Sequence, residues 1–317
     1  MSAFNFDSSA KTTIAAGSGA ELVDEFGVLT AAGIDEARKV DAATPIQGEK
    51  YFKTKNVDKN NYSFQALNNI GLAQLNSDGD NLPIDKKSLG FDQVISNYTM
   101  RQSMMITREL LETDRYGVIG DHSRSLVHSA RKTIERILAD PFNRGFGTAN
   151  LAILAEDGLG FFSAGRPQPK NSAGTWSNLE ASGALTADAV ATARVNFRKY
   201  LDGSGDLDPQ VMKKVIVSPD QEDTIKEIVG TNLKVDTSLN NTNIVSDVNY
   251  EVWDWLDSGI VAYCGDTEND LQFHVRVSPS VMVFQDGQNP DKLWSRLRMA
   301  LGTGLLRPGM YRGQQIV

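Results

Sequence analysis

Residues 121–140 read DHSRSLVHSARKTIERILAD, and this stretch decides the fold. Its apolar residues recur at helical spacing and share one face, which consists of Leu126, Ala130, Ile134, Ile137 and Leu138. The opposite face is charged and carries Arg124, Arg131, Lys132, Glu135 and Arg136. Pro141 follows and is expected to end the helix, because proline lacks the N–H that a helix interior needs. The pattern predicts an amphipathic helix of about five turns with one face on a core.

The basic side chains of this helix, Arg124, Arg131, Lys132 and Arg136, admit two interpretations. They could contact nucleic acid, because Lys and Arg pair with phosphates. They could also form a solvated face with salt bridges to other chains, and we favour this second interpretation. The net charge of the whole chain is −8, which argues against a large basic surface.

The segments before the helix have little apolar content. Residues 1–60 mix small residues with helix breakers and are expected to form an extended arm that lies on another surface. Residues 62–67 alternate with period two, and residues 76–81 (NSDGDN) are a strong turn signal. Few large apolar residues lie between Asn68 and Gln93. We therefore expect a hairpin over 61–105 that has no independent core and projects from the body.

A compact α/β unit is expected over residues 186–275. Thr186 is the expected N-cap of its first helix, and Val215–Val217 is the expected buried strand. Ser218 is then the expected N-cap of a second helix, which Gly230 closes. The unit holds 7 Lys and Arg against 16 Asp and Glu, a net charge of −9. This acidity predicts negligible binding to DNA.

Two alternating stretches follow towards the end of the chain. In residues 271–277 the apolar side chains are expected to face inward, which places His274 on the solvent side. Residues 292–299 alternate in the same way. This strand is expected to break at Gly302 and Gly304, before a basic end. The basic residues of that end are Arg307 and Arg312.

No constellation of residues indicates catalysis, a metal or a cofactor. The three histidines are His122, His128 and His274, and none has metal-ligand spacing to the single cysteine, Cys264. Neither a phosphate-binding glycine loop nor a nucleophile elbow is present. Residues 202–208 resemble the start of a calcium loop but lack its later glutamate, so we interpret them as an acidic turn. Trp253 and Trp255 are interpreted as core or interface anchors.

Nothing in the sequence indicates a membrane or a secretory route. No run of about 18 apolar residues is present, so no transmembrane helix is expected. Residues 1–20 lack the basic start and apolar core of a secretory signal. One cysteine in 317 residues fits a reducing compartment.

Five short strings, taken in order and spacing over residues 100–300, resemble the major capsid proteins of tailed bacteriophages. They look closest to the head-subunit family related to the phage Mu major head protein. The strings are Ile106–Gly117 (ITRELLETDRYG), Asp157–Ser163 (DGLGFFS), Trp176–Leu179 (WSNL), Asp206–Pro209 (DLDP) and Val215–Pro219 (VIVSP). Gly165-Arg166-Pro167 stands where that family often has His-Pro, so no role of that histidine is carried over.

The resemblance implies an α+β protein of the Hong Kong 97-type capsid fold. Its parts would be an N-terminal arm (1–60), an E-loop hairpin (61–105), a peripheral domain with a long spine helix (106–185), an axial α/β domain (186–275) and a return to the peripheral domain (276–317).

The implied function is that of a major capsid protein, which assembles as pentamers and hexamers into an icosahedral shell around double-stranded phage DNA. The expected contacts between subunits lie in the E-loop, at Leu72, Leu75, Asp78, Gly79, Leu82 and Ile84. The resemblance further implies a separate scaffolding protein and a portal, leaves room for a decoration protein, and implies DNA that is enclosed without specific binding. The expected location is the virion, and the host cytoplasm during assembly. We expect no enzymatic activity and no proteolytic removal of an N-terminal segment.

Two alternatives remain open from the sequence. An encapsulin-like bacterial compartment has the same fold but encloses protein cargo. A soluble binding protein or enzyme of two α/β domains belongs to a different class and would form small oligomers rather than large shells.

Overall fold

The computed structural model describes residues 45–67, 89–113, 118–147, 155, 157–167, 174–201, 206–230, 242–265, 271–289, 291–305 and 308–316. The helices are η1 (Gly48–Tyr51), α2 (Arg108–Thr113), α3 (Val118–Asn143), α4 (Ala187–Arg198), η3 (Pro219–Gln221), α5 (Glu222–Val229) and η4 (Pro308–Met310). The strands are β1 (Lys53–Asn56), β2 (Asn61–Leu67), β3 (Leu89–Ser96), β4 (Tyr98–Thr107), β5 (Arg166–Pro167), β6 (Thr175–Trp176), β7 (Lys214–Val217), β8 (Asn249–Val252), β9 (Ile260–Cys264), β10 (Leu271–Gln285), β11 (Lys292–Leu305) and β12 (Tyr311–Gln315). The protein is thus mixed α and β.

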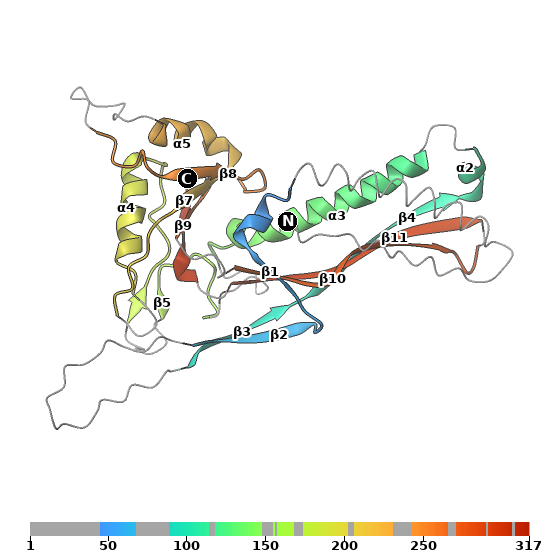
Figure 1. The fold of residues 1–317 in the computed structure, drawn as a ribbon, viewed down its shortest axis with the longest axis horizontal. Coiled ribbons are helices and arrows are strands. Elements are labelled where there is room, and N and C mark those ends of the chain that lie inside the picture. Colours follow the sequence, from blue (N-terminus) through green and yellow to red (C-terminus); the bar gives the residue numbers. More distant parts are fainter. Residues whose placement is uncertain are drawn as a thin grey trace.

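A long, narrow sheet and the helix α3 form the extended part of the molecule (Figure 1). The strand order is β1-β10-β11-β4, with β1 parallel to β10 and the other pairs antiparallel. Helix α3 runs along one face of this sheet (Figure 1). Leu126, Ala130, Ile134 and Leu138 are buried under it, which confirms the apolar face that the sequence predicts.

Helix α3 is longer than expected, and Pro141 lies inside it rather than at its end. The proline removes one hydrogen bond in the last turn. That turn is held from outside, because Phe142 is fully buried with its ring centroid 5.3 Å from that of Phe161. Asn143 also binds the following unit, donating from Nδ2 to the Trp255 carbonyl (3.0 Å) and accepting from the Asp257 N–H (3.0 Å).

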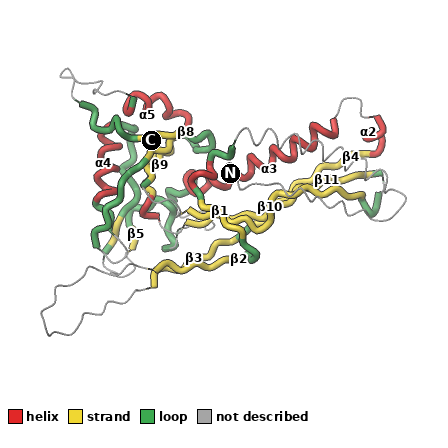
Figure 2. The backbone as a smooth tube through the Cα atoms, viewed as in Figure 1, coloured by secondary structure: helices red, strands yellow, loops and turns green. Residues whose placement is uncertain are grey.

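The hairpin β2–β3 lies against the other face of the sheet (Figure 2). Strand β11 continues through Gly302 and Gly304, so the expected break is wrong. The hairpin packs directly on the backbone at these two glycines, where a side chain would leave no room. A Cβ at Gly304 would lie 2.1 Å from Cδ1 of Ile95. Residues 98–105, expected in the hairpin, instead belong to β4 and pair with β11.

The same hairpin explains why His274 is fully buried although it was expected at the surface. Tyr62 of β2 covers its ring edge-on, with ring centroids 5.5 Å apart. Strand β1 lies beside it, with Lys55 as its register partner. Both faces of β10 are therefore covered at this point. The alternation of apolar and polar residues along the strand consequently does not predict which side chains are buried.

The second unit is a sheet of order β12-β9-β7-β8 with α4 and α5 on one face. The α/β unit was expected over 186–275; in this sheet the edge strand is β12, from residues 311–315, whereas β10 lies in the long sheet. Thr186 caps α4 as predicted, its Oγ1 accepting from the Ala189 N–H (3.1 Å). The Ser218 hydroxyl caps nothing; its carbonyl closes the turn instead, accepting from the Gln221 N–H (3.0 Å).

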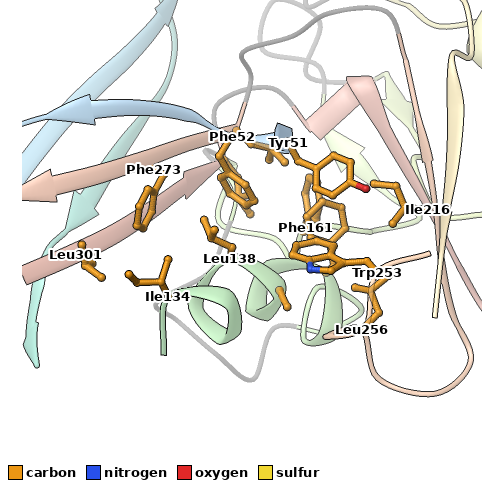
Figure 3. Packing of buried hydrophobic residues seen from close by; sticks show 14 of the residues in the cluster. Tyr51, Phe52, Ile134, Leu138, Phe161, Ile216, Trp253, Leu256, Phe273 and Leu301 are labelled. Atoms are coloured by element: carbon orange, nitrogen blue, oxygen red, sulfur yellow. The ribbon is translucent and has the colours of Figure 1, made fainter. Parts of the chain in front are cut away.

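A shared aromatic core joins the two units (Figure 3). Trp253 is fully buried, as an anchor should be, with its ring centroid 5.4 Å from that of Phe142 and 5.1 Å from that of Tyr51. In Figure 3, Tyr51 points across this core towards Ile216 of β7. Because one core serves both units, they pack as one body.

Candidate assembly surfaces

The hairpin is anchored at its base by a dense set of polar and apolar contacts. Asn97, between β3 and β4, donates from its backbone N–H to the Asn60 carbonyl (2.7 Å) and from Nδ2 to the Lys59 carbonyl (2.9 Å). Ile95 is almost fully buried against β11. The six residues predicted to contact a neighbour, Leu72, Leu75, Asp78, Gly79, Leu82 and Ile84, lie outside the described residues.

Two of the four cations on the predicted basic face of α3 already bind groups within the chain. Arg124 forms an ion pair with Asp121 at 2.7 Å, and Arg131 donates to the Pro45 carbonyl at 3.2 Å. Lys132 and Arg136 are exposed.

Glu135 was expected on this charged face but is buried. Its carboxylate accepts the backbone N–H groups of Gln47 (2.5 Å) and Gly48 (3.1 Å) at the start of η1. It therefore fixes the chain that leads into the long sheet.

Sequence reasoning missed a buried ion pair that holds the loops between the two units. Arg166 is fully buried and donates to Asp157 Oδ2 (2.6 Å), Asn178 Oδ1 (3.0 Å) and the carbonyls of Phe161 (2.7 Å) and Gly160. Asp157 lies in the glycine-rich string DGLGFFS, but nothing in the string marks its arginine partner. Arg166 thus stands where the resemblance would place His-Pro.

A second buried pair changes the interpretation of the basic end of the chain. Arg312 in β12 donates to Glu180, and both side chains are almost fully buried. Arg312 is therefore not available for DNA, while Arg307 lies outside the described residues.

A polar cavity of about 540 Å³ lies where the two units meet, lined in part by Lys50, Lys213, Lys214 and Tyr51. Glu251 also lines it, and pairs with Lys50 at 2.9 Å and with Lys214 at 3.4 Å. Burial raises the pKa of the Glu251 carboxyl, but hydrogen bonds from Tyr51 and Lys50 and the charge of Lys214 outweigh it and hold that pKa below its usual value. Burial and the same carboxylate raise the pKa of the Tyr51 hydroxyl. The cavity thus holds an internal salt-bridge network.

The described residues contain no group of three or more His, Cys, Asp or Glu that could hold a metal ion. Cys264 is buried, and burial raises the pKa of its thiol, which disfavours the reactive thiolate. Among the described helices none is long and apolar enough to cross a membrane.

A long helix on a narrow sheet, a hairpin anchored on the opposite face and a compact α/β unit at one end define the Hong Kong 97-type class of shell subunits (Figure 1). The model of a family described as phage capsid protein matches residues 102–313. The chain belongs to this phage capsid protein family. It is a major capsid protein, whose copies build an icosahedral shell.

Solved structures agree in fold. The capsid of the cyanophage P-SCSP1u aligns with a TM-score of 0.60 at 11% identity, covering 86% of this chain and 88% of that one. A chain of Mycobacterium phage Patience aligns with a TM-score of 0.59 at 10% identity, covering 92% and 88%. A capsid chain of an empty GTA particle aligns with a TM-score of 0.56 at 11% identity, covering 86% and 90%. No match was found among curated protein sequences.

The family decides between the alternatives that the sequence leaves open. The matched family is one of phage capsid proteins, which supports the capsid subunit over both alternatives. The predicted class of fold and the predicted shell function are confirmed. The likeness to the phage Mu head family stays a resemblance.

Proposed function

We propose that this subunit acts through pentamers and hexamers that enclose double-stranded DNA, and that the hairpin is its main contact with the adjacent subunit of the same capsomer. One observation carries the proposal. Strands β2 and β3 are anchored by Ile95 and Asn97, so the 21 residues between Leu67 and Leu89 follow from a fixed base. An isolated two-stranded hairpin is marginal in water, so a neighbouring surface must stabilise it.

The test is a deletion of residues 69–87 that leaves both strands in place. The subunit core should stay folded, because Trp253, Phe142 and the other core residues lie outside the hairpin. Assembly should fail, because each buried leucine of the loop would contribute on the order of 1.5–3 kcal/mol at every subunit. Circular dichroism reports folding, and negative-stain microscopy reports shells. Lys226→Ala, which removes only an exposed salt bridge on α5, is the matched control. Normal shells from the deleted protein would refute the proposal.

The DNA-facing role follows from charge. Lys132 and Arg136 are exposed cations of α3, and Arg124, also exposed, is paired with Asp121; we propose Lys132 and Arg136 for weak contact with packed DNA. The acidic α/β unit would contribute none, which suits DNA that must slide during filling and ejection. The role is mechanical and requires no catalysis.

The remaining partners follow from the life of such a shell. We propose that assembly takes place in the host cytoplasm, with scaffolding supplied by a separate protein and a portal at one vertex. A decoration protein could bind the finished shell.

A further inference from the structure

The polar cavity between the two units brings ammonium groups from both of them together. Lys50 comes from η1 in the extended part of the molecule, and Lys214 comes from β7 in the α/β unit. Their Nζ atoms lie 2.9 Å and 3.4 Å from the same carboxylate oxygen, Oε2 of Glu251. The same two Nζ atoms lie 5.1 Å and 4.8 Å from the centroid of the Tyr51 ring. Two cations from different units therefore converge in one cavity.

This cluster carries an excess of positive charge. Two ammonium groups share the single carboxylate of Glu251, so these three side chains have a net charge of +1. Lys213 lines the same cavity, and Glu251 is the one acidic residue among the described residues that line it. The excess contrasts with the net charge of −9 over residues 186–275. An anion from solvent is therefore attracted to the cavity rather than to the rest of the α/β unit.

The ammonium groups can bind a ligand in addition to Glu251. An ammonium group has three donors, and one contact with the carboxylate leaves two for another acceptor. The side chains of Lys50 and Lys214 are 44% and 29% exposed, so solvent reaches both of them. Asn249, the register partner of Lys214 on β8, adds a further polar side chain to the lining.

Charge and size indicate the chemistry of the ligand. A phosphate monoester carries a charge of about −1.5 to −2 at pH 7 and presents three strong acceptor oxygens. It can therefore bind several ammonium groups at once, and lysine is a common phosphate ligand in proteins. The cavity of about 540 Å³ lies within the range of small-molecule sites, roughly 300–1,000 Å³. It has room for a phosphate together with a small organic group, for which the lining residue Tyr250 offers an aromatic ring.

We propose that this cavity binds a small phosphate dianion, either inorganic phosphate or the phosphate of a mononucleotide. Lys50 and Lys214 bind the phosphate oxygens, while Glu251 holds the two ammonium groups close together. Because the binding groups come from both units, the ligand stabilises the folded arrangement of their junction. The inference does not depend on the proposed role of the hairpin.

Calorimetric titration of the full-length subunit tests the site with three probes: inorganic phosphate, adenosine monophosphate and adenosine. Saturable binding of both phosphate compounds is expected, and no binding of adenosine, because the lysines recognise the charge. Tighter binding of adenosine monophosphate than of phosphate would identify a nucleotide as the ligand, and equal or weaker binding would identify the free anion. Adenosine that binds as tightly as its monophosphate, or no saturable binding of either phosphate compound, would overturn the proposal.

Lysine variants locate the site. Lys214→Met should weaken phosphate binding about tenfold or more, because it removes a charge-assisted hydrogen bond and keeps the length of the side chain. Lys214→Arg keeps the charge and should retain most of the affinity. Lys226→Met, at an exposed position on α5, is the matched control and should bind phosphate like the wild type. Circular dichroism shows that each variant is folded. Wild-type affinity in Lys214→Met would contradict the assignment.

Glu251→Gln separates a ligand site from a salt-bridge network that serves the fold alone. The substitution keeps the shape of the side chain and removes the carboxylate that competes with the ligand for the two lysines. Phosphate affinity should therefore rise about threefold or more. Unchanged or weaker binding in the folded variant would refute the proposal. A short DNA duplex should not bind in the cavity, and duplex binding that Lys214→Met abolishes would assign these lysines to packed DNA instead.

Discussion

Replacing Arg166 with leucine is expected to lower the free energy of unfolding of the subunit by about 3–5 kcal/mol. The guanidinium is fully buried, and Asp157, 2.6 Å away, is only 4% exposed. The substitution would therefore leave an uncompensated carboxylate in the interior. It would also remove the donors to the Phe161 carbonyl and to Asn178.

The assay is urea unfolding of the unassembled subunit, followed by circular dichroism. The double variant Arg166→Leu, Asp157→Asn should recover about 2 kcal/mol, because it removes the stranded charge and leaves only unpaired neutral acceptors, each costing roughly 1–3 kcal/mol. Arg194→Leu is the matched control: its 2.8 Å pair with Asp247 is solvent-exposed and should be worth about 1 kcal/mol or less. Equal losses from Arg166→Leu and Arg194→Leu, or no recovery in the double variant, would show that the buried pair does not stabilise the junction.

Three further predictions test other parts of the structure. Gly302→Ala should loosen the hairpin base and lower the free energy of unfolding by about 1–3 kcal/mol, because its Cβ would lie 2.6 Å from the Ser96 carbonyl. Faster hydrogen exchange in β2 and β3 would show this loosening. Gly120→Ala in α3, which has open space around it, is the control and should be neutral or stabilising. Burial and the nearby Lys55 lower the pKa of His274 to about 4, so between about pH 4 and 6.5 the unfolded chain binds a proton that the folded chain does not. The free energy of unfolding should therefore fall by about 2–3 kcal/mol as the pH drops from about 6.5 to about 4. Unfolding curves of His274→Gln should lack this loss. Lys132→Glu with Arg136→Glu should leave folding unchanged and weaken the binding of DNA by assembled shells. If DNA binding, measured at several salt concentrations, does not change, these two residues of α3 do not contact DNA.

The periodicity of the sequence was sufficient to predict the main helix, the capped helix after Thr186 and the buried strand at Val215–Val217. Each of these depends on neighbours along the chain, either through helical spacing or through a local cap. The order of elements, together with the five short strings, was enough to indicate the fold.

The features that the sequence did not predict have a different physical origin, because they depend on contacts between segments far apart in the sequence. Glu135 has the spacing of a surface residue, yet it binds two backbone N–H groups from residues nearly ninety positions earlier. Arg166 forms its pair from β5, a strand of two residues that is too short to show a periodicity. Strand β12 joins the α/β unit from the far end of the chain, which no local pattern could reveal. The hairpin tip, with its six predicted contact residues, remains a prediction.

One of these long-range effects does leave a trace in the sequence, on a single face of β11. The side chains of that face, taken in order, are Trp294, Arg296, Arg298, Ala300, Gly302 and Gly304. They shrink along the strand, from an indole to no side chain at all. The small end lies under the chain's own hairpin, where a Cβ at Gly302 or Gly304 would collide with Asn97 or Ile95. At the large end Trp294, Arg296 and Arg298 are half-buried, beside the exposed Phe284 and Met105. A strand buried uniformly within one chain has no reason for such a gradient, because close packing fills every position equally. A strand whose small end receives the chain's own hairpin does have one. The two glycines that were expected to break the strand therefore form the small end of this gradient.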